Sequence, residues 1–571
     1  MDVATSLVLG PMLRYADETS ATVWVETASS STVTVTCAGR SWEAPTFLVE
    51  GHHYALVIIE GLERASTHDY AVSLDGEMVW PAPDSPHPAP HIRTIDRTQP
   101  TRLAYGSCRT AVPHDEEGNR TNGVDALRAL ALAIAAGTAA QPDLIAFLGD
   151  QVYADMTSDA MREYISERRS LDEPPGEEIK DYEEYSHLYR LAWTDPANRW
   201  LLSTVPSCMI FDDHDIRDDW NTSWTWHEEI NRTSWWHERL IGGLASYWVY
   251  QHIGNLSPAQ LRADEVYARV VAHVGGGELD LTDVVNDLAR RVDRHPEVYR
   301  WSYVRDFGDS RLVVVDSRAA RVLEPKRRSM LDPDEMAWLE EQLTGDVDHL
   351  LIGTSLPFLL PPGLHDLEAI DEVLATGAFS SAALSRPVSY VAERLRQTVD
   401  LEHWAAFNEG FAEVFELVMA VARGERGRPP STITFLSGDV HNSYVAQVED
   451  AGKHGARSLI VQAVCSPIRN PMPRGTRIMM SAFAKRLVRP MRWIATRSDR
   501  IPDPVYPWRV TDGPWFDNCI GELRVSGPDL ELTWRRGEVR SSAGSGDEDP
   551  ILTNVATVRI AGYPAREATP A

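Results

Sequence analysis

A series of short apolar segments, several of them ending in polar residues, limits the folds open to this chain more than any other feature. From residue 101 onward they alternate with helical patterns such as residues 334–343 and 402–423. Short, continuous apolar segments are typical of strands buried on both faces, and their alternation with helices predicts an α/β fold. The segments are RLAYGSC, PDLIAFLGD, SCMIFDDHD, RLVVVDSR, HLLIGTS, TITFLSGDVH and SLIVQAVCS.

The N-terminal region, residues 5–97, follows a different pattern. Segments rich in Val, Thr, Tyr and Trp, such as ATVWVET and STVTVTC, are separated by polar or glycine-containing turns at short intervals. This spacing predicts a small all-β sandwich over residues 1–80. Prolines crowd residues 81–94, which argues against a helix or a central strand there. We therefore expect a stiff linker over residues 81–98 that marks a domain boundary.

The length of 571 residues also favours two domains, one of them large. We expect the large domain to cover residues 99–537, with helical insertions at about 157–200 and 222–300, followed by a partly flexible extension, 538–571. The tryptophans of the second insertion are expected to pack a helical cap, and the alternative is an aromatic wall of a substrate pocket. These tryptophans are Trp224, Trp226, Trp235, Trp236 and Trp248.

The formal net charge of −29 argues against general nucleic-acid binding, because an acidic surface repels phosphate backbones. It would also repel a phosphorylated substrate, so a site for such a substrate needs local positive charge from metal ions or arginines. The five cysteines are far apart and include no CxxC pair, which excludes a disulfide framework and a zinc finger of the usual spacing.

The N-terminal residues show no sign of an export signal. They lack a basic region, a long apolar core and a twin-arginine pair. The most apolar stretch, residues 129–140, is shorter than the roughly 20 residues that cross a bilayer. We expect a cytoplasmic protein with no membrane span and no obligate protein partner.

Four of the predicted strands end in clusters that can carry chemistry, at residues 106–109, 149–155, 212–215 and 438–441. Strand ends converge on one edge of a parallel sheet, so carboxylates, imidazoles, a thiol and a phenol are expected to meet there. So many acids share a buried site only if cations neutralise them. Tyrosinate and thiolate ligands favour Fe(III) among common metals. Asp150, which ends a strand after a glycine, is the natural bridging carboxylate.

The motifs GSC, GDQVYAD, DDHD and GDVH, in this order, resemble the signature blocks of PhoD-like phosphatases (alkaline phosphatase D) in the calcineurin-like metallophosphoesterase superfamily. The resemblance covers about residues 5–535. It implies a four-layer αββα sandwich, preceded by a small domain like those of immunoglobulin or fibronectin. It also implies two or more metal ions, Fe(III) with Ca(II), or Zn or Mn as in other superfamily members.

The same resemblance assigns roles to individual residues. It implies that His214 is the catalytic histidine, with Asp150 as the second catalytic residue, and that the metal ligands are Cys108, Asp150, Tyr153, Asp213, Asp439 and His441. Two positions depart from the wider superfamily: Cys108 replaces the opening Asp-x-His, and Thr354 and Ser355 stand where a histidine often ends a strand. The residues that could complete the second metal site are Asp155, Asp212 and Asn442.

Other interpretations of these residues stay open from the sequence. The alternative role of Cys108 is that of a small buried side chain, and the alternative role of Tyr153 is to cap a core with its hydroxyl outward. Arg109 and Arg217 lie beside the clusters and suit either phosphate oxygens or ion pairs with nearby aspartates. Arg318 is expected to be structural.

The resulting prediction is a metal-dependent hydrolase of small-molecule phosphoesters, of the alkaline phosphatase type, acting on monoesters, diesters or both. A metal-activated hydroxide would attack phosphorus, and His214 would act as general acid. The alternatives are a phospholipase D-type phosphodiesterase, a hydrolase of non-phosphate esters and a non-catalytic phosphate-binding homologue. A further alternative makes the N-terminal sandwich a carbohydrate- or protein-binding module.

Overall fold

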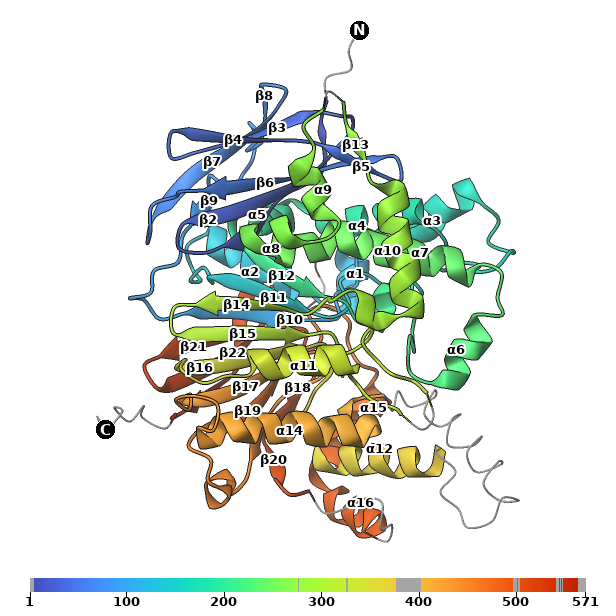
Figure 1. Cartoon of the computed structure of the whole chain (residues 1–571), viewed down its shortest axis with the longest axis vertical. Helices are drawn as coiled ribbons and strands as arrows, with labels where there is room; N and C mark the ends of the chain where they lie inside the picture. Colours follow the sequence, from blue (N-terminus) through green and yellow to red (C-terminus); the bar gives the residue numbers. More distant parts are fainter. Residues whose placement is uncertain are drawn as a thin grey trace.

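In the computed structural model the described residues run from 5 to 562, except for 276, 325–326, 376–401, 497–500, 502–503, 541–543, 545 and 547. The N-terminal region forms two packed β-sheets (Figure 1). The first has the order β1 (Leu7–Ala16), β2 (Ser20–Thr27), β6 (His52–Glu60), β5 (Phe47–Val49) and β13 (Leu279–Asp280). The second has the order β4 (Arg40–Pro45), β3 (Thr32–Cys37), β7 (Thr67–Leu74) and β8 (Glu77–Trp80), with β9 (His91–Arg93) also paired to β7.

Alternating apolar residues of the two sheets form the core of this sandwich, as the period-two pattern of a half-buried strand requires. Val23 and Val25 of β2 face Val33 and Val35 of β3, and all four are fully buried. Two strands come from segments for which the sequence predicted no strand. β9 lies inside the stretch that the sequence suggested as a linker, and β13 comes from the second helical insertion.

The large domain is built on two further sheets. In the first, β10 to β12 are parallel, and β10 pairs antiparallel with β21; the order is β12 (Ser207–Ile210), β11 (Leu144–Leu148), β10 (Arg102–Gly106), β21 (Cys519–Ser526), β22 (Asp529–Glu538) and β23 (Ile551–Ile560). In the second, the central strands are parallel; the order is β14 (Tyr303–Phe307), β15 (Ser310–Val315), β16 (His349–Thr354), β17 (Thr432–Ser437), β19 (Leu459–Val464), β18 (Ser443–Val448) and β20 (Trp508–Trp515).

These two sheets pack face to face between helices. Leu312 and Val314 of β15 point into the core shared with the first sheet, while Val313 and Val315 point toward the outer helices. The outer layers include α2 (Ala126–Ala135) against β22, and α11 (Pro333–Gln342) and α14 (Asn408–Arg423) over the second sheet (Figure 1). The predicted fold class, an αββα sandwich preceded by an all-β sandwich, is confirmed.

The helical insertions join the two domains. The first contributes α3 (Asp159–Arg168), α4 (Tyr182–Trp193) and α5 (Pro196–Thr204), and the second contributes α6 (Trp224–Ile230), α7 (Trp236–Tyr247), α8 (Pro258–Ala263), α9 (Tyr267–Ala272) and α10 (Thr282–Arg294). Trp236 and Trp248 are buried, whereas Trp224 is 42% exposed. Trp24 of β2 packs against Tyr250, with 5.4 Å between ring centroids. Residues of the first sheet, including Trp24, therefore belong to the apolar core of the large domain, which is separate from the core inside the sandwich.

Two further features concern the chain as a whole. The five cysteines are all buried and unpaired with one another. Among the described helices, each is too short or too polar to cross a lipid bilayer.

Candidate metal centre and active site

The polar clusters lie where strands of both central sheets end. Cys108 follows β10, Asp150 follows β11, and Asp213 follows β12 in the first sheet. Asp439 and His441 follow β17 of the second sheet. Because the two sheets pack face to face, their carboxyl edges bring residues far apart in the sequence to one place, as the strand-end pattern predicts.

At four of these five positions the backbone is in a left-handed conformation that non-glycine residues seldom adopt. The φ angles are 57° at Cys108, 40° at Asp150, 63° at Asp439 and 48° at His441. Such residues are held by surrounding structure and concentrate at functional sites. The two loops also approach closely: a Cβ on Gly438 would lie 1.9 Å from Ser107 Oγ, so only glycine fits there.

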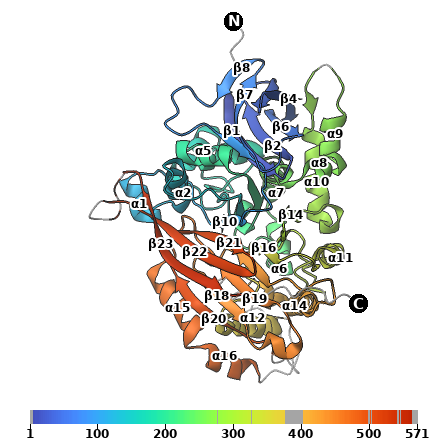
Figure 2. The same ribbon diagram turned by 90° about the vertical axis from the view of Figure 1, so that its left-hand side faces the viewer.

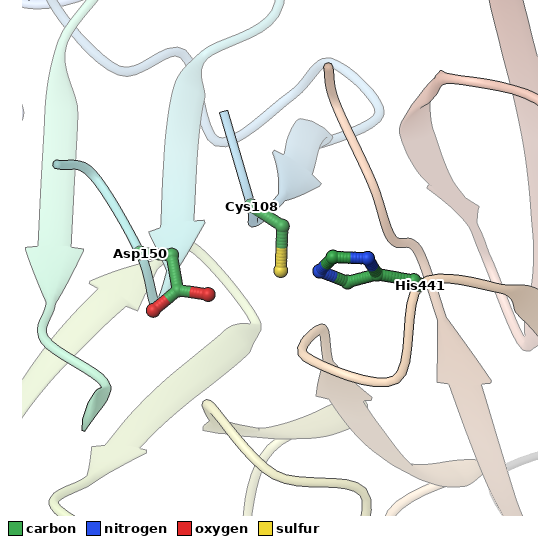
Figure 3. A group of neighbouring side chains, drawn as sticks. All are labelled: Cys108, Asp150 and His441. Atoms are coloured by element: carbon green, nitrogen blue, oxygen red, sulfur yellow. The ribbon is translucent and has the colours of Figure 1, made fainter. Parts of the chain in front are cut away.

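Potential ligand atoms gather into groups that share members. Cys108, Asp150 and His441 form one group, and Asp150 with Asp213 and His214 forms another, each with ligand atoms within 4.8 Å of one another. Figure 3 shows the thiol of Cys108 between the carboxylate of Asp150 and the ring of His441. Asp212, Asp213 and Asp439 form a third group at the same spacing. Asp150 and Asp213 thus each belong to two groups, which is the arrangement expected of bridging carboxylates.

The electrostatics of this cluster require positive charge. Burial, reinforced by neighbouring carboxylates, raises the pKa of Asp150 and Asp213 well above the usual range and that of Asp212 to about 6. Asp150 Oδ1 and Asp212 Oδ2 are buried and accept no hydrogen bond from any described residue. Unpaired buried carboxylate oxygens are costly, and cations beside them would remove that cost. The donor set therefore fits metal ions.

The thiol and the phenol have environments that suit ligands. Ser466 Oγ donates to Cys108 Sγ at 3.2 Å, and Tyr153 OH lies 3.3 Å from Asp150 Oδ2. Burial raises the pKa of Cys108 and of Tyr153, so without a cation both stay protonated. Burial lowers the pKa of His441 to about 4, which leaves its imidazole neutral, as a ligand must be.

His214 is oriented by an aspartate. Its Nδ1 donates to Asp155 Oδ1 at 2.9 Å, while Nε2 lies 3.9 Å from an oxygen of Asp218. Burial lowers the pKa of His214, but the carboxylates of Asp155 and Asp213 outweigh burial, so the pKa lies well above the usual value. Asp155, which the sequence offered as a ligand, is therefore already committed to fixing this ring.

Arg318 lies behind the cluster in a buried ion-pair network. Its guanidinium contacts the carboxylates of Asp212 and Glu402, and Nη2 lies 3.2 Å from Asp213 Oδ1. Arg318 and Asp212 are fully buried. This geometry agrees with a structural role for Arg318, which offsets the charge of the acidic cluster and holds two of its members.

The strand-end pattern missed a histidine at the site. His403 donates from Nε2 to Asp439 Oδ2 at 3.1 Å and from Nδ1 to Glu368 Oε1 at 2.7 Å. It precedes a helix rather than following a strand, so no strand-end signal marks it. Its sequence neighbour, Glu402, enters the Arg318 network for the same topological reason.

A pocket of about 560 Å³ adjoins this cluster: Asp213, Asp439 and His441 line it, whereas Cys108, Asp150 and Tyr153 are not among its described lining residues. Its polar lining residues include Asp213, His214, His403 and His441. The rest of the lining is mostly apolar; it comprises Leu364, Val440, Met472, Pro473, Thr476, Met479, Met480 and Phe483. No tryptophan of the second insertion is among the described lining residues.

The remaining predicted site residues lie outside that lining. Arg109 Nε donates to Asp125 Oδ2 at 3.0 Å, and Arg217 Nε donates to Glu178 Oε2 at 3.1 Å. Both arginines are thus engaged in ion pairs, Arg109 with an aspartate and Arg217 with a glutamate. Asn442 is buried, and its amide donates to Val440 O at 2.7 Å.

Comparisons with known proteins identify a family and a related fold. A model of the PhoD-like phosphatase family matches residues 126–497, and a model described as a domain of unknown function (DUF7800) matches residues 4–92. No curated protein matches the chain.

Among solved structures, "Structure of PhoD" is similar with a TM-score of 0.57 and 13% identity, covering 98% of this chain and 91% of that chain. At this identity the likeness shows the fold alone. "The type III pullulan hydrolase from Thermococcus kodakarensis" has 12% identity over 93% of this chain and 94% of that chain, but its TM-score of 0.14 carries no weight. The family match spans more than half of the sequence, so this chain belongs to the PhoD-like phosphatase family.

Proposed function

We propose that this chain hydrolyses phosphoesters at a centre of two metal ions held by Cys108, Asp150, Tyr153, Asp213, Asp439 and His441. The observation that carries the proposal is the set of overlapping ligand groups sharing Asp150 and Asp213, with buried carboxylate oxygens that no described residue satisfies. When bound, the ions would lower the pKa of a coordinated water and neutralise charge on the phosphate group.

The ligand chemistry divides into two sets. Cys108, Tyr153 and His441 offer sulfur, phenolate and imidazole beside Asp150, which suits Fe(III). Asp213, Asp439 and Asp212 offer oxygens, which suit a harder ion such as Ca(II). Zn or Mn is the alternative pair. His403 orients Asp439, a member of the second set, through the hydrogen bond from its Nε2 to Asp439 Oδ2.

His214 is proposed to protonate the leaving oxygen. It lines the pocket, and its pairing through Nδ1 with Asp155 fixes the ring so that Nε2 is the nitrogen left for proton donation. A general acid must reach the leaving group and hold its proton until the bond breaks.

The pocket favours esters that carry an apolar group. Met479, Met480 and Phe483 line the same pocket as His214 and His441, so they are available to contact the alcohol part of a substrate whose phosphate faces those histidines. This supports an aryl or alkyl phosphoester, including a diester of the phospholipase D type, over a small sugar phosphate.

The first test compares an aryl phosphomonoester with a bis-aryl phosphodiester, using the protein loaded with iron and calcium. Asp150→Asn is expected to lose about 10³-fold or more in kcat/KM and to retain less metal by elemental analysis. Asp264→Asn, the same change in the helical insertion, is the matched control. If the loaded wild type hydrolyses neither ester after trials with zinc and manganese as well, the phosphate-binding alternative replaces this proposal.

A further inference from the structure

One segment of this acidic chain has the opposite charge. Residues 451–498 contain no aspartate or glutamate, although the whole chain carries 84. The segment includes two helices, α15 (Arg474–Lys485) and α16 (Val488–Ala495). Their basic residues, including the one between them, are Arg474, Arg477, Lys485, Arg486, Arg489 and Arg492.

The same helices expose large apolar side chains. Ile478 is 74% exposed, Trp493 is 63% exposed, and Met479 and Ile494 are each 41% exposed. Clusters of exposed apolar residues mark binding surfaces. We call this cluster of outward residues the α15–α16 surface: Arg474, Ile478, Met479, Lys485, Arg486, Arg489, Trp493 and Ile494.

The exposed residues of α16 follow the spacing of one helix face. Arg489 and Trp493 are four residues apart on α16, as are Pro490 and Ile494, and all four are exposed. Basic and apolar groups therefore share the outward side of α16. A hollow of about 350 Å³ indents the neighbouring helix, lined by Ile478, Ala482 and Ser481 between basic groups; those groups are Arg477, Lys485 and Arg486.

The helix α15 also lines the active site. Met480 and Phe483 line the pocket from this helix, and Met479 both lines the pocket and is exposed, so it lies at the rim. Figure 2 shows α15 and α16 toward the end of the molecule opposite the N-terminal sandwich. The α15–α16 surface is thus next to the pocket and far from the domain that precedes it.

We propose that the α15–α16 surface docks this protein on an anionic lipid bilayer. Amphipathic helices with basic residues beside exposed tryptophan and aliphatic side chains lie in the bilayer interface, where the charges meet lipid phosphates and the apolar groups enter the acyl boundary. The hollow between Arg477, Lys485 and Arg486 suits a lipid phosphate. Repulsion from the acidic remainder is screened beyond a Debye length of about 8–10 Å.

A second copy of this chain fits the surface less well. A two-fold contact places the same patch against itself, so the basic residues of α15 and α16 would face identical positive charges. An anionic bilayer instead satisfies the charges and the apolar groups together. Docking would bring the pocket rim at Met479 to the lipid surface, and this last step rests on the proposed hydrolase function.

The test is co-flotation of the full chain with vesicles of phosphatidylglycerol and phosphatidylcholine, compared with phosphatidylcholine alone. Binding is expected only to the anionic vesicles and is expected to weaken with salt. Replacing Lys485, Arg486 and Arg489 together by Ser should lower the partition coefficient about 100-fold, since each basic residue contributes about 1 kcal/mol near an anionic surface. Trp493→Ser should weaken binding without changing its salt dependence.

The controls separate docking from folding and from chemistry. The matched control replaces Arg64, Lys453 and Arg559, exposed basic residues elsewhere, and should bind like wild type. Hydrolysis of a soluble aryl phosphate should be unchanged in the α15–α16 variant. Vesicle binding without esterase activity would contradict the proposed function but would support the docking proposal.

Two results would overturn the docking proposal. One is absence of flotation with anionic vesicles at low salt, or equal loss of binding in the matched control. The other is a change of molar mass, by light scattering, from dimer to monomer in the α15–α16 variant without vesicle binding, which would assign the surface to a second copy.

Discussion

At the residue scale, the pairing of His214 with Asp155 determines what the imidazole can do during turnover. One ring nitrogen is held by a buried carboxylate at 2.9 Å, so the ring cannot flip without losing that bond. A histidine fixed in this way can deliver a proton only from Nε2. Its contribution should therefore depend on how strongly the leaving oxygen needs a proton.

The Asp155→Asn variant tests whether the contribution of His214 depends on the leaving group. We expect kcat to fall about 10²-fold for an alkyl phosphoester, whose leaving group is poor, and less than about 10-fold for a nitrophenyl ester. Asp172→Asn is the matched control, because that aspartate is exposed and is not among the residues that line the pocket. Equal losses on both esters would contradict a proton-donating role and indicate a general disturbance of the site.

Some residues of the site could be predicted from the sequence, and others could not. Asp150, Asp213 and Asp439 each follow an apolar strand, and the convergence of strand ends predicts that they meet. His403 reaches the site from the start of a helix, and that placement depends on packing of distant elements that no local pattern encodes. Arg109 follows Cys108 directly, yet its side chain pairs with Asp125, because adjacent residues project in different directions.

At the element scale, strand β1 anchors the N-terminal sandwich to the large domain through one buried arginine. Arg14 donates to the carbonyls of Tyr250 at 2.6 Å, Gln251 at 2.7 Å and Ser207 at 3.3 Å. Its guanidinium is fully buried, and no described carboxylate pairs with it. The positive charge is held by carbonyl dipoles of the insertion and of β12.

We expect Arg14→Ala to lower the free energy of unfolding by about 3 kcal/mol, since three buried carbonyls lose their donor. Arg40→Ala is the control, because Arg40 is exposed and bonds within the sandwich. Thermal and urea unfolding of both variants measure the difference.

Deletion of residues 1–97 tests the role of the whole sandwich. We expect the shortened protein to aggregate; a folded, active protein would favour the alternative that the sandwich is a binding module.

The buried strands of the large domain could be predicted from the sequence, whereas the edge strands β13 and β23 could not. The buried strands of the large domain are continuous apolar runs, so the sequence identifies them. β13 has only two residues, and it forms because the insertion packs beside β5. β23 follows a Gly/Ser-rich stretch that suggested a flexible extension, yet it pairs with β22 along its length. Such edge strands are determined by the neighbour they cover, which a local pattern does not reveal.

At the scale of the whole molecule, the sheet that carries Cys108 and Asp150 is completed by the C-terminal part of the chain. We expect a chain ending after residue 540 to aggregate, because removing β23 exposes β22 as a long open edge and uncovers α2. A chain ending after residue 562 is the control and should stay active. Solubility and aryl phosphatase activity measure both, and an active, soluble shorter chain would show that β23 is dispensable.

The pairing of β10 with β21 also bears on how a newborn chain acquires its site. β10 is made early, but its antiparallel neighbour β21 is made only after β11 to β20 have been translated. Until then the strand that precedes Cys108 has one unpaired edge. We therefore expect chaperones that shield exposed strand edges to act on the growing chain until β21 has been made.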